Sequence, residues 1–448
     1  MTKKDKITLS HADAEGSPPA GDNSLLRQKI SRRDMLRLTG ASGLGLLLGG
    51  GGVGSIMAAR QAAGRAVPAA AASGLSAGAA DTIPFYGKHQ AGIITPAQNF
   101  LCFASFDLTT SRLSDVQKLL QAWTTAAAAL TSGTLIGSAN DNPNLPPADT
   151  GEADGLTPSK CTLTFGVGPA LFDGRFGLAG KRPGSFTELP AFPGDSLESR
   201  WSGGDLCVQA CADDMQVAFH AIRNLARLAR GTAVLRWTQE GFQRSGSADP
   251  SGGTPRNLLG FKDGTGNPDV TDDAKMRSIV WSGGTDGPAW MNGGSYLALR
   301  RVRFRIEVWD RSSLSDQEAT FGRHRQSGAP LGARDEFAKL DLTATDAGGK
   351  PVIPPDSHSA LAHGDGSIQM LRRSYSYSSG MDLKTGQLDA GLVFISFQKD
   401  LKQFVTIQQR LAANDRLNEY MAHTGSAVFA CFPGVREGGT IGEQLLEG

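Results

Sequence analysis

The chain has 448 residues, 45 of them basic and 44 acidic, and its formal net charge is +1. This near-neutral balance, with no block of like charge, excludes a basic surface that would gather nucleic acid. The hydrophobic content of 40% and the charged content of 20% are ordinary for a soluble globular protein, and the length allows two or three domains. We therefore expect small molecules or protein surfaces as partners, and no nucleic acid.

The N-terminal 80 residues predict an export signal. The paired arginines Arg32 and Arg33 precede an apolar, glycine-rich stretch that runs from Leu38 to Ala59, and small residues follow it. This arrangement resembles the twin-arginine motif of proteins that fold before export. A membrane anchor and a disordered tail are the alternatives, although many glycines make a poor membrane helix.

We accordingly expect residues 1–80 to be a twin-arginine signal and leader. This interpretation implies the twin-arginine translocase as a partner during export and a periplasmic or extracellular location. It also implies that the mature form has no stable membrane span.

The first half of the mature chain predicts alternating strands and helices. Apolar runs that predict strands lie at 99–106, 161–167, 205–210 and 232–242. Helices are expected from Ser114 and from Asp213 and Asp214, because these residue types cap helices and the apolar residues that follow recur at helical spacing.

The second half repeats this order. Residues 302–308 alternate between apolar and polar, which predicts a strand with one wet face, and 391–397 and 426–432 predict two more strands. A helix is expected from Asp400. The order strand–helix–strand–strand–helix–strand is ferredoxin-like. A long insertion at about 310–390 should carry function.

The expected fold is therefore α+β, with two ferredoxin-like domains in tandem. Each domain would be an antiparallel sheet with helices on one side. The expected boundaries are 81–270 for the N-terminal domain and 271–448 for the C-terminal domain.

A glycine-rich loop is the first candidate for chemistry. Gly260, Gly264 and Gly266 allow backbone conformations closed to other residues, and Asp263 is the carboxylate between them. A plain turn is the alternative, because Asp-Gly is itself a turn signal. The spacing does not match a GxGxxG dinucleotide fingerprint.

The histidines and cysteines narrow the kind of site further. No HExxH motif is present among the seven histidines, which excludes a zincin, but His358 lies inside the long insertion. The adjacent Arg372 and Arg373 follow it, and such a pair after an apolar residue is unusual for a solvated face. The five cysteines include no CxxC pair, which argues against a thiolate-bound metal, and most lie in apolar runs typical of buried residues.

These residues resemble a known family. Asp263 in Gly-Phe-Lys-Asp-Gly resembles the GxxDG motif of dye-decolourising peroxidases, and His358 in Asp-Ser-His resembles their proximal haem ligand. Arg372 resembles their distal arginine, with Arg373 as the alternative. The resemblance covers nearly all of 83–434 and is closest to the exported bacterial branch, which has deferrochelatase-type members.

The resemblance implies a haem peroxidase with one haem b (iron protoporphyrin IX) per chain, held in the C-terminal half. Hydrogen peroxide would be the oxidant, and dyes or other one-electron donors the reductants. His358 would ligate the iron, Asp263 would act as the distal acid and base, and Arg372 would stabilise developing charge. Gly264 would also contact the cofactor. Asp389 resembles the carboxylate that bonds to the proximal histidine, and an ordinary turn aspartate is the alternative.

Two other functions stay open. A deferrochelatase-type protein would use the same pocket to release iron from haem for iron acquisition. A non-catalytic, dimeric ferredoxin-like binding module would require three family motifs to coincide by accident. The sequence leaves the physiological reductant and homo-oligomer formation open.

Overall fold

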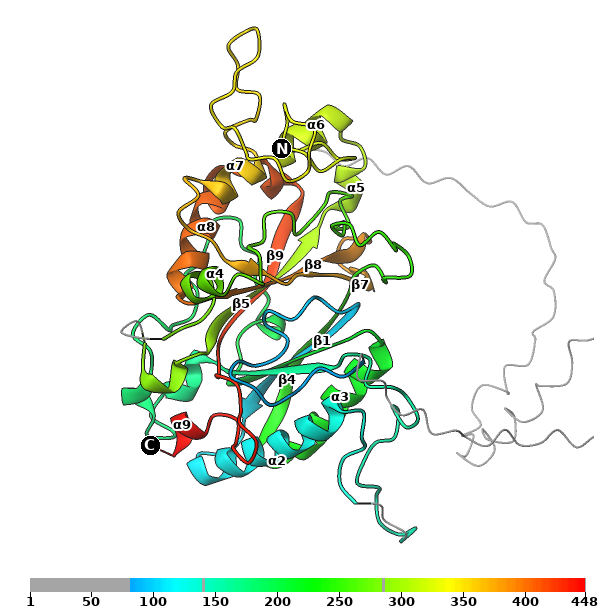
Figure 1. Ribbon diagram of the computed structural model, residues 1–448, viewed down its shortest axis with the longest axis vertical. Coiled ribbons are helices and arrows are strands. Elements are labelled where there is room, and N and C mark those ends of the chain that lie inside the picture. The colour runs from blue at the N-terminus through cyan, green and yellow to red at the C-terminus, as the bar shows by residue number, and fades with distance from the viewer. Residues whose placement is uncertain (1–80, 139–141, 284–286, 448) are drawn as a thin grey trace, which may run out of the picture. The chain divides into compact units, whose positions relative to one another are not determined.

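The computed structural model describes residues 81–138, 142–283 and 287–447, so the predicted signal and leader at 1–80 lie outside the described residues. Within these ranges nine strands form one antiparallel sheet, in the order β5-β9-β2-β3-β1-β4-β7-β8-β6. The strands are β1 (Phe100–Leu108), β2 (Thr162–Val167), β3 (Leu206–Ala212), β4 (Ala233–Phe242), β5 (Ser295–Phe304), β6 (Leu371–Arg372), β7 (Tyr375–Met381), β8 (Leu388–Gln398) and β9 (Met421–Cys431). An additional pairing between β5 and β8 closes the sheet into a barrel (Figure 1).

Helices cover the barrel on two sides. They are α2 (Leu113–Thr131), α3 (Met215–Leu228), α4 (Asp273–Ile279), α5 (Ile306–Trp309), α6 (Leu314–Phe321), α7 (His358–His363), α8 (Leu401–Asn414) and α9 (Glu443–Leu446). Short 3₁₀ helices lie at Pro169–Phe172, Ala179–Lys181, Ser199–Trp201, Ala289–Met291 and Arg416–Glu419. In Figure 1, α2 and α3 lie along one side of the barrel, and α7 and α8 lie along the other. None of the helices in the described ranges is long and apolar enough to cross a membrane.

The barrel is filled by side chains from strands of both halves of the chain. Leu101 and Phe103 of β1 belong to the same buried cluster as Leu297 of β5, Phe397 of β8 and Phe429 of β9. Alternate residues of a strand point to opposite faces, so the remaining buried residues of these strands lie against the helices. Both faces are therefore covered, and for this reason β1, β2 and β3 are buried along nearly their whole length.

Local signals set two of the three helix starts that the sequence predicts. The helix expected from Ser114 begins at Leu113 instead, and its N-cap residue Arg112 makes no side-chain cap bond. The Asp214 side chain accepts a hydrogen bond from the Val217 backbone N–H at the start of α3. Asp400 and Gln403 form a reciprocal capping box at the start of α8. Both predicted starts are confirmed, and the five cysteines are buried and unpaired, as their apolar surroundings indicated.

The strand predicted at 302–308 is wrong in its bounds. β5 runs from Ser295 to Phe304, and the chain then forms the helical turn α5. This turn buries Trp309, whose indole N–H donates to the Leu259 carbonyl oxygen. The apolar surface of Trp309 packs edge-on against Phe321, with 5.8 Å between the ring centroids. Burial of this large ring outweighs the local strand pattern.

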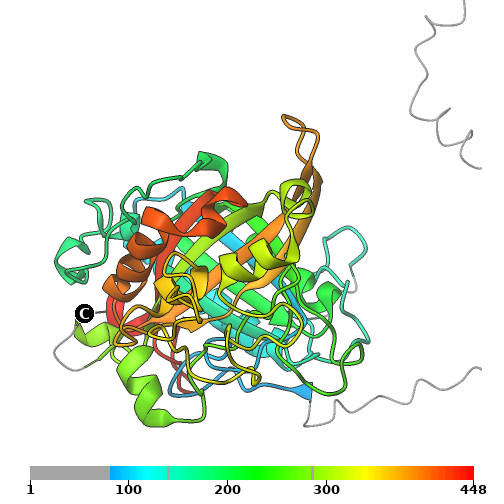
Figure 2. The same ribbon diagram turned by 90° about the horizontal axis from the view of Figure 1, so that it is seen from above.

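The segment between β5 and β8 contains α5, α6, α7, β6 and β7. Figure 2 views the molecule from above and shows this segment, coloured yellow-green to orange, in front of the barrel strands. The predicted insertion therefore lies over one end of the molecule and supplies a wall of the cavity described next.

Candidate functional site

A cavity of about 260 Å³ lies between α7, α8 and one face of β5 and β8. Its residues all fall between Asn257 and His423 in the sequence. Apolar side chains form much of its wall, among them Val302, Phe304, Phe321, Phe394, Ile407 and Leu411. His358, Asp263 and Arg372, which are far apart in the sequence, all line it.

His358 is the first residue of α7, and its imidazole has one engaged nitrogen and one free nitrogen. Nδ1 lies 2.7 Å from Oδ2 of Asp415, whose side chain is 0% exposed. The second oxygen of Asp415 accepts a hydrogen bond from the Leu417 backbone N–H. Within the described residues Nε2 has no hydrogen-bond partner, so a ligand in the cavity can take it.

Burial and the nearby charges together set the pKa of the His358 imidazole. Burial acts to lower the pKa of His358, but the Asp415 carboxylate opposes it, and the pKa is raised overall. Arg372 lowers and Asp263 raises the same pKa, because both charges lie near the ring. An imidazole with a carboxylate on one nitrogen is a strong electron donor through the other.

Asp263 and Arg372 form an ion pair in the cavity. Nη1 of Arg372 donates to Oδ1 of Asp263 at 3.0 Å. The Asn267 amide group donates to the backbone oxygen of Arg372 at 2.8 Å and accepts from its backbone N–H at 3.1 Å. Gly264 next to Asp263 has a φ of +126°, a conformation that side-chain-bearing residues rarely adopt. The loop and β6 are therefore fixed to each other where the pair forms.

Of the two adjacent arginines, Arg372 is the one whose side chain pairs with Asp263 in the cavity. Arg373 follows it on the extended strand and points to the other side. There its guanidinium donates to the Thr95 carbonyl oxygen and to the Gln98 side chain, and it is buried.

The predicted bond between Asp389 and His358 is corrected by the structure. Asp389 accepts hydrogen bonds from Arg301 at 2.8 Å and from the Tyr377 hydroxyl at 3.1 Å. The carboxylate that bonds to His358 is Asp415, because α7 packs against α8 and Asp415 directly follows α8. No local pattern in the sequence marks Asp415 as buried or as the partner of His358.

Two arginines that the sequence reasoning did not select also line the cavity. Arg300 is 1% exposed and pairs with Asp195, yet its Nε has no partner among the described residues. Arg323 donates to the backbone oxygens of Gly328 and Glu336. Burial lowers the pKa of both guanidinium groups.

The residues present fit a haem. The apolar wall suits the flat macrocycle, and the free Nε2 of His358 suits its iron. Arg300, with its orphaned Nε, and Arg323 supply positive charge for acidic substituents. A protein that combines these groups with a carboxylate–guanidinium pair in one cavity is a histidine-ligated haem enzyme.

Comparison with known proteins agrees with this class. The N-terminal model of the Dyp-type peroxidase family matches residues 90–243, and its C-terminal model matches 254–436. Deferrochelatases of Escherichia coli (strain K12) and Shigella boydii serotype 4 are each 43% identical, over 81% of this chain and 87% of theirs. Ferric DtpA from Streptomyces lividans is 38% identical with a TM-score of 0.77, over 82% of this chain and 97% of that chain. The chain therefore belongs to the Dyp-type peroxidase family, and it is a haem peroxidase.

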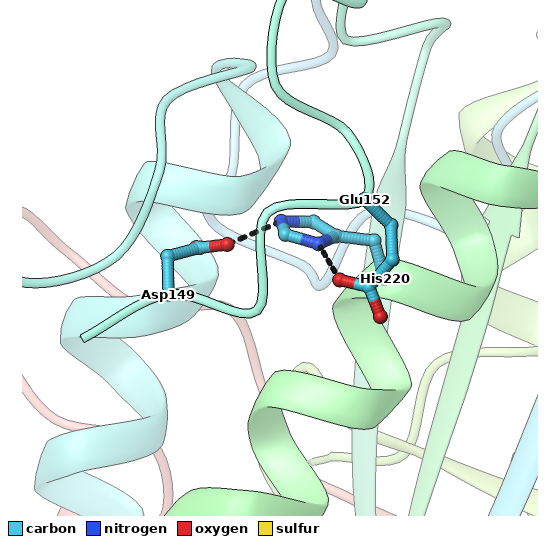
Figure 3. Close-up of side chains that lie close together, drawn as sticks. All are labelled: Asp149, Glu152 and His220. Carbon is cyan, nitrogen blue, oxygen red and sulfur yellow. Dashed lines mark hydrogen bonds and ion pairs between the residues drawn. The ribbon is translucent and has the colours of Figure 1, made fainter. Parts of the chain in front are cut away.

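A second histidine–carboxylate cluster lies on α3. Nδ1 of His220 lies 3.0 Å from Oε2 of Glu152, and its Nε2 lies 3.5 Å from Oδ1 of Asp149. Figure 3 shows the two carboxylates on opposite edges of the imidazole. Arg223 also pairs with Glu152. Both ring nitrogens are engaged, so we interpret the cluster as an ion-pair clamp that ties the loop at 149–152 to α3.

Proposed function

We propose that this peroxidase uses hydrogen peroxide to oxidise dyes or other one-electron donors, with one haem b per chain. The observation that carries the proposal is the single cavity that contains His358, with its free Nε2, together with the Asp263–Arg372 pair. The haem, when bound, supplies an iron that exchanges electrons with peroxide and with the reductant.

On the proximal side, Nε2 of His358 is the proposed iron ligand. Its Nδ1–H donates to Asp415, and this bond fixes the tautomer and the ring orientation. The partial negative charge that the ring gains favours the oxidised metal. Gly264 lines the same cavity, and we propose that its lack of a side chain leaves room for the cofactor.

On the distal side, Asp263 is the proposed acid and base. Its carboxylate accepts a proton from hydrogen peroxide and returns it to the departing oxygen. Arg372, 3.0 Å from that carboxylate, stabilises the negative charge that develops as the O–O bond breaks. The hydrogen bonds between the Asn267 side chain and the Arg372 backbone hold the Asp263 loop and Arg372 in fixed positions relative to each other.

The test is the rate of reaction with peroxide in Asp263→Asn, followed by rapid-mixing absorption spectroscopy of the haem-loaded protein. We expect a loss of about 10²–10⁴-fold, the usual contribution of a general acid–base group, with the haem content unchanged. Asp269→Asn changes an exposed carboxylate of the same loop and should react like wild type. An unchanged rate in Asp263→Asn would contradict the assignment.

We also propose that 81–270 and 271–448 are two ferredoxin-like units in tandem and that the second holds the haem. The strand orders β2-β3-β1-β4 and β9-β5-β8-β7 support this division, because each places the first and third strands in the middle. Apart from the loop at 257–266, the cavity-lining residues belong to the second unit.

Export through the twin-arginine translocase to the periplasm or the outside of the cell is proposed as well. The sequence alone supports it, through Arg32 and Arg33 before an apolar stretch.

The name shared by the 43% identical relatives favours a second candidate function, the release of iron from haem. The two functions differ in what happens to the macrocycle. An iron-releasing protein would leave free, fluorescent protoporphyrin behind, whereas a peroxidase turns over dye with its haem intact. Fluorescence of the haem-loaded protein during incubation with a reductant and an iron chelator distinguishes them.

A further inference from the structure

A partly buried carboxylate outside the cavity holds the loop that carries Asp263. Glu336 lies between α6 and α7, and its side chain is 11% exposed. One of its oxygens, Oε1, accepts hydrogen bonds from the hydroxyls of Thr254 and Thr265, the latter at 2.8 Å. The other, Oε2, pairs with the Lys262 ammonium. All three partners belong to one loop.

These contacts bracket Asp263 on both sides. Lys262 directly precedes Asp263, and Thr265 follows it by two positions. Thr254 lies at the start of the loop, next to Pro255, whose carbonyl oxygen accepts the Asp263 backbone N–H. A single carboxylate therefore fixes three points of a loop whose glycines would otherwise leave the backbone free.

Glu336 is itself anchored to the cavity wall. Nη1 of Arg323, which lines the cavity, donates to the backbone oxygen of Glu336 at 3.1 Å. Gly328, with a φ of +78°, lies against Lys262, and a Cβ there would come within 2.7 Å of the Lys262 side chain. This close packing restricts the conformation of the Lys262 side chain, whose ammonium group pairs with Glu336.

The carboxylate is held in its charged form. Burial acts to raise the pKa of Glu336, but the bonds from Lys262, Thr254 and Thr265 oppose it, and the pKa is lowered. Charge-assisted hydrogen bonds of this kind are the strong ones in proteins.

We propose that Glu336 is a positioning residue for the reaction with peroxide. It holds Lys262 and Thr265, and through them it sets where the Asp263 carboxylate lies. It is absent from the cavity lining and acts only through the loop. The inference rests on the proposed function, because it requires Asp263 to be the acid and base. Proton transfer needs the carboxylate within hydrogen-bond reach of the peroxide, so a loose loop slows the step.

The experiment uses the haem-loaded protein and measures the rate of reaction with peroxide by rapid mixing. Glu336→Ala should lower that rate by about 10- to 100-fold, since a misplacement of about 1 Å can cost 10²-fold. The haem absorption spectrum and the KM for the dye should not change. Glu336→Gln should recover part of the rate, because its amide oxygen still accepts from the two threonines. Glu437→Gln, at an exposed carboxylate, is the matched control.

A double variant separates positioning from general damage. In an Asp263→Asn background, Glu336→Ala should cause no further loss, because the group that it positions has already been removed. An equal loss in both backgrounds would overturn the inference. If Asp263→Asn reacts slowly with peroxide while Glu336→Ala reacts like wild type, this inference is overturned and the proposed function stands. An unaffected Asp263→Asn would overturn the proposed function and this inference with it.

Thr265→Val provides a milder variant in case Glu336→Ala does not fold. It removes one of the three bonds that Glu336 accepts from the loop. We expect it to lower the rate of reaction with peroxide by a smaller factor than Glu336→Ala, and only when Asp263 is present. A wild-type rate in Thr265→Val together with a wild-type rate in Glu336→Gln would count against the inference.

Discussion

Two of the histidines that contact carboxylates, His220 and His358, differ in how many of their ring nitrogens are engaged. His220 has a carboxylate at each ring nitrogen, Glu152 at 3.0 Å and Asp149 at 3.5 Å. His358 has Asp415 at one nitrogen, 2.7 Å away, and the other nitrogen faces a cavity. Both histidines pair with an acid, but of the two only His358 keeps a ring nitrogen without a partner beside a cavity.

The space beside each ring completes the contrast. The cavity at His358 measures about 260 Å³, whereas the pocket that His220 lines measures about 10 Å³. A pocket of that size holds about one water molecule at most. A buried histidine next to an acid is therefore a poor indicator of function by itself, and the free nitrogen together with the cavity is the better one.

The contrast between His358 and His220 predicts its largest effect, the loss of histidine-ligated haem, for His358→Ala. The variant removes the proposed iron ligand, so the reconstituted protein should lack histidine-ligated haem. The absorption spectrum checks this as a lost or displaced Soret band. A wild-type spectrum in the variant would break the comparison.

His220→Ala is the matched control for that experiment. It leaves Asp149 and Glu152 without their shared partner, which should destabilise the fold by about 1–3 kcal/mol in thermal unfolding. The Soret band should stay as in wild type.

The next effect in size is expected for Asp415→Asn, which keeps the shape of the residue and removes its charge. Replacing such a hydrogen-bond partner typically costs about 10–100-fold in metal affinity or activity. The reduction potential of the bound haem should also rise, because the imidazole donates less electron density. Asp389→Asn should leave the potential unchanged, because Asp389 contacts Arg301 and Tyr377. Equal shifts in both variants would contradict the role of Asp415.

The smallest effect is expected for Glu152→Gln in the clamp, and it should depend on pH. Burial acts to raise the pKa of Glu152, but bonds from Thr150, His220 and Arg223 lower it to about 2, below the usual value of 4.5. The charged carboxylate thus stabilises the fold above about pH 4.5, and this contribution is lost as the pH falls toward 2. The variant should be less stable by about 1 kcal/mol near neutrality. Thermal unfolding should show this gap narrowing in acid, and a gap independent of pH would refute the clamp.

Part of the fold could be predicted because its signals are local. The caps at Asp214 and Asp400 lie within a few residues of the helices that they begin, and both helices are present. The alternation at 302–308 was local too, but it misled, because the buried Trp309 that follows it donates a hydrogen bond to the Leu259 carbonyl oxygen, 50 positions away.

The candidate site divides in the same way. Asp263, His358 and Arg372 stand in short motifs, so the sequence by itself determined which residue types could carry the chemistry. Only the tertiary structure decided that Arg372 and not Arg373 faces the cavity and that Asp415 bonds to His358. The physical reason is that a motif records the neighbours of a residue along the sequence. A hydrogen bond between residues 57 positions apart depends on how α7 packs against α8.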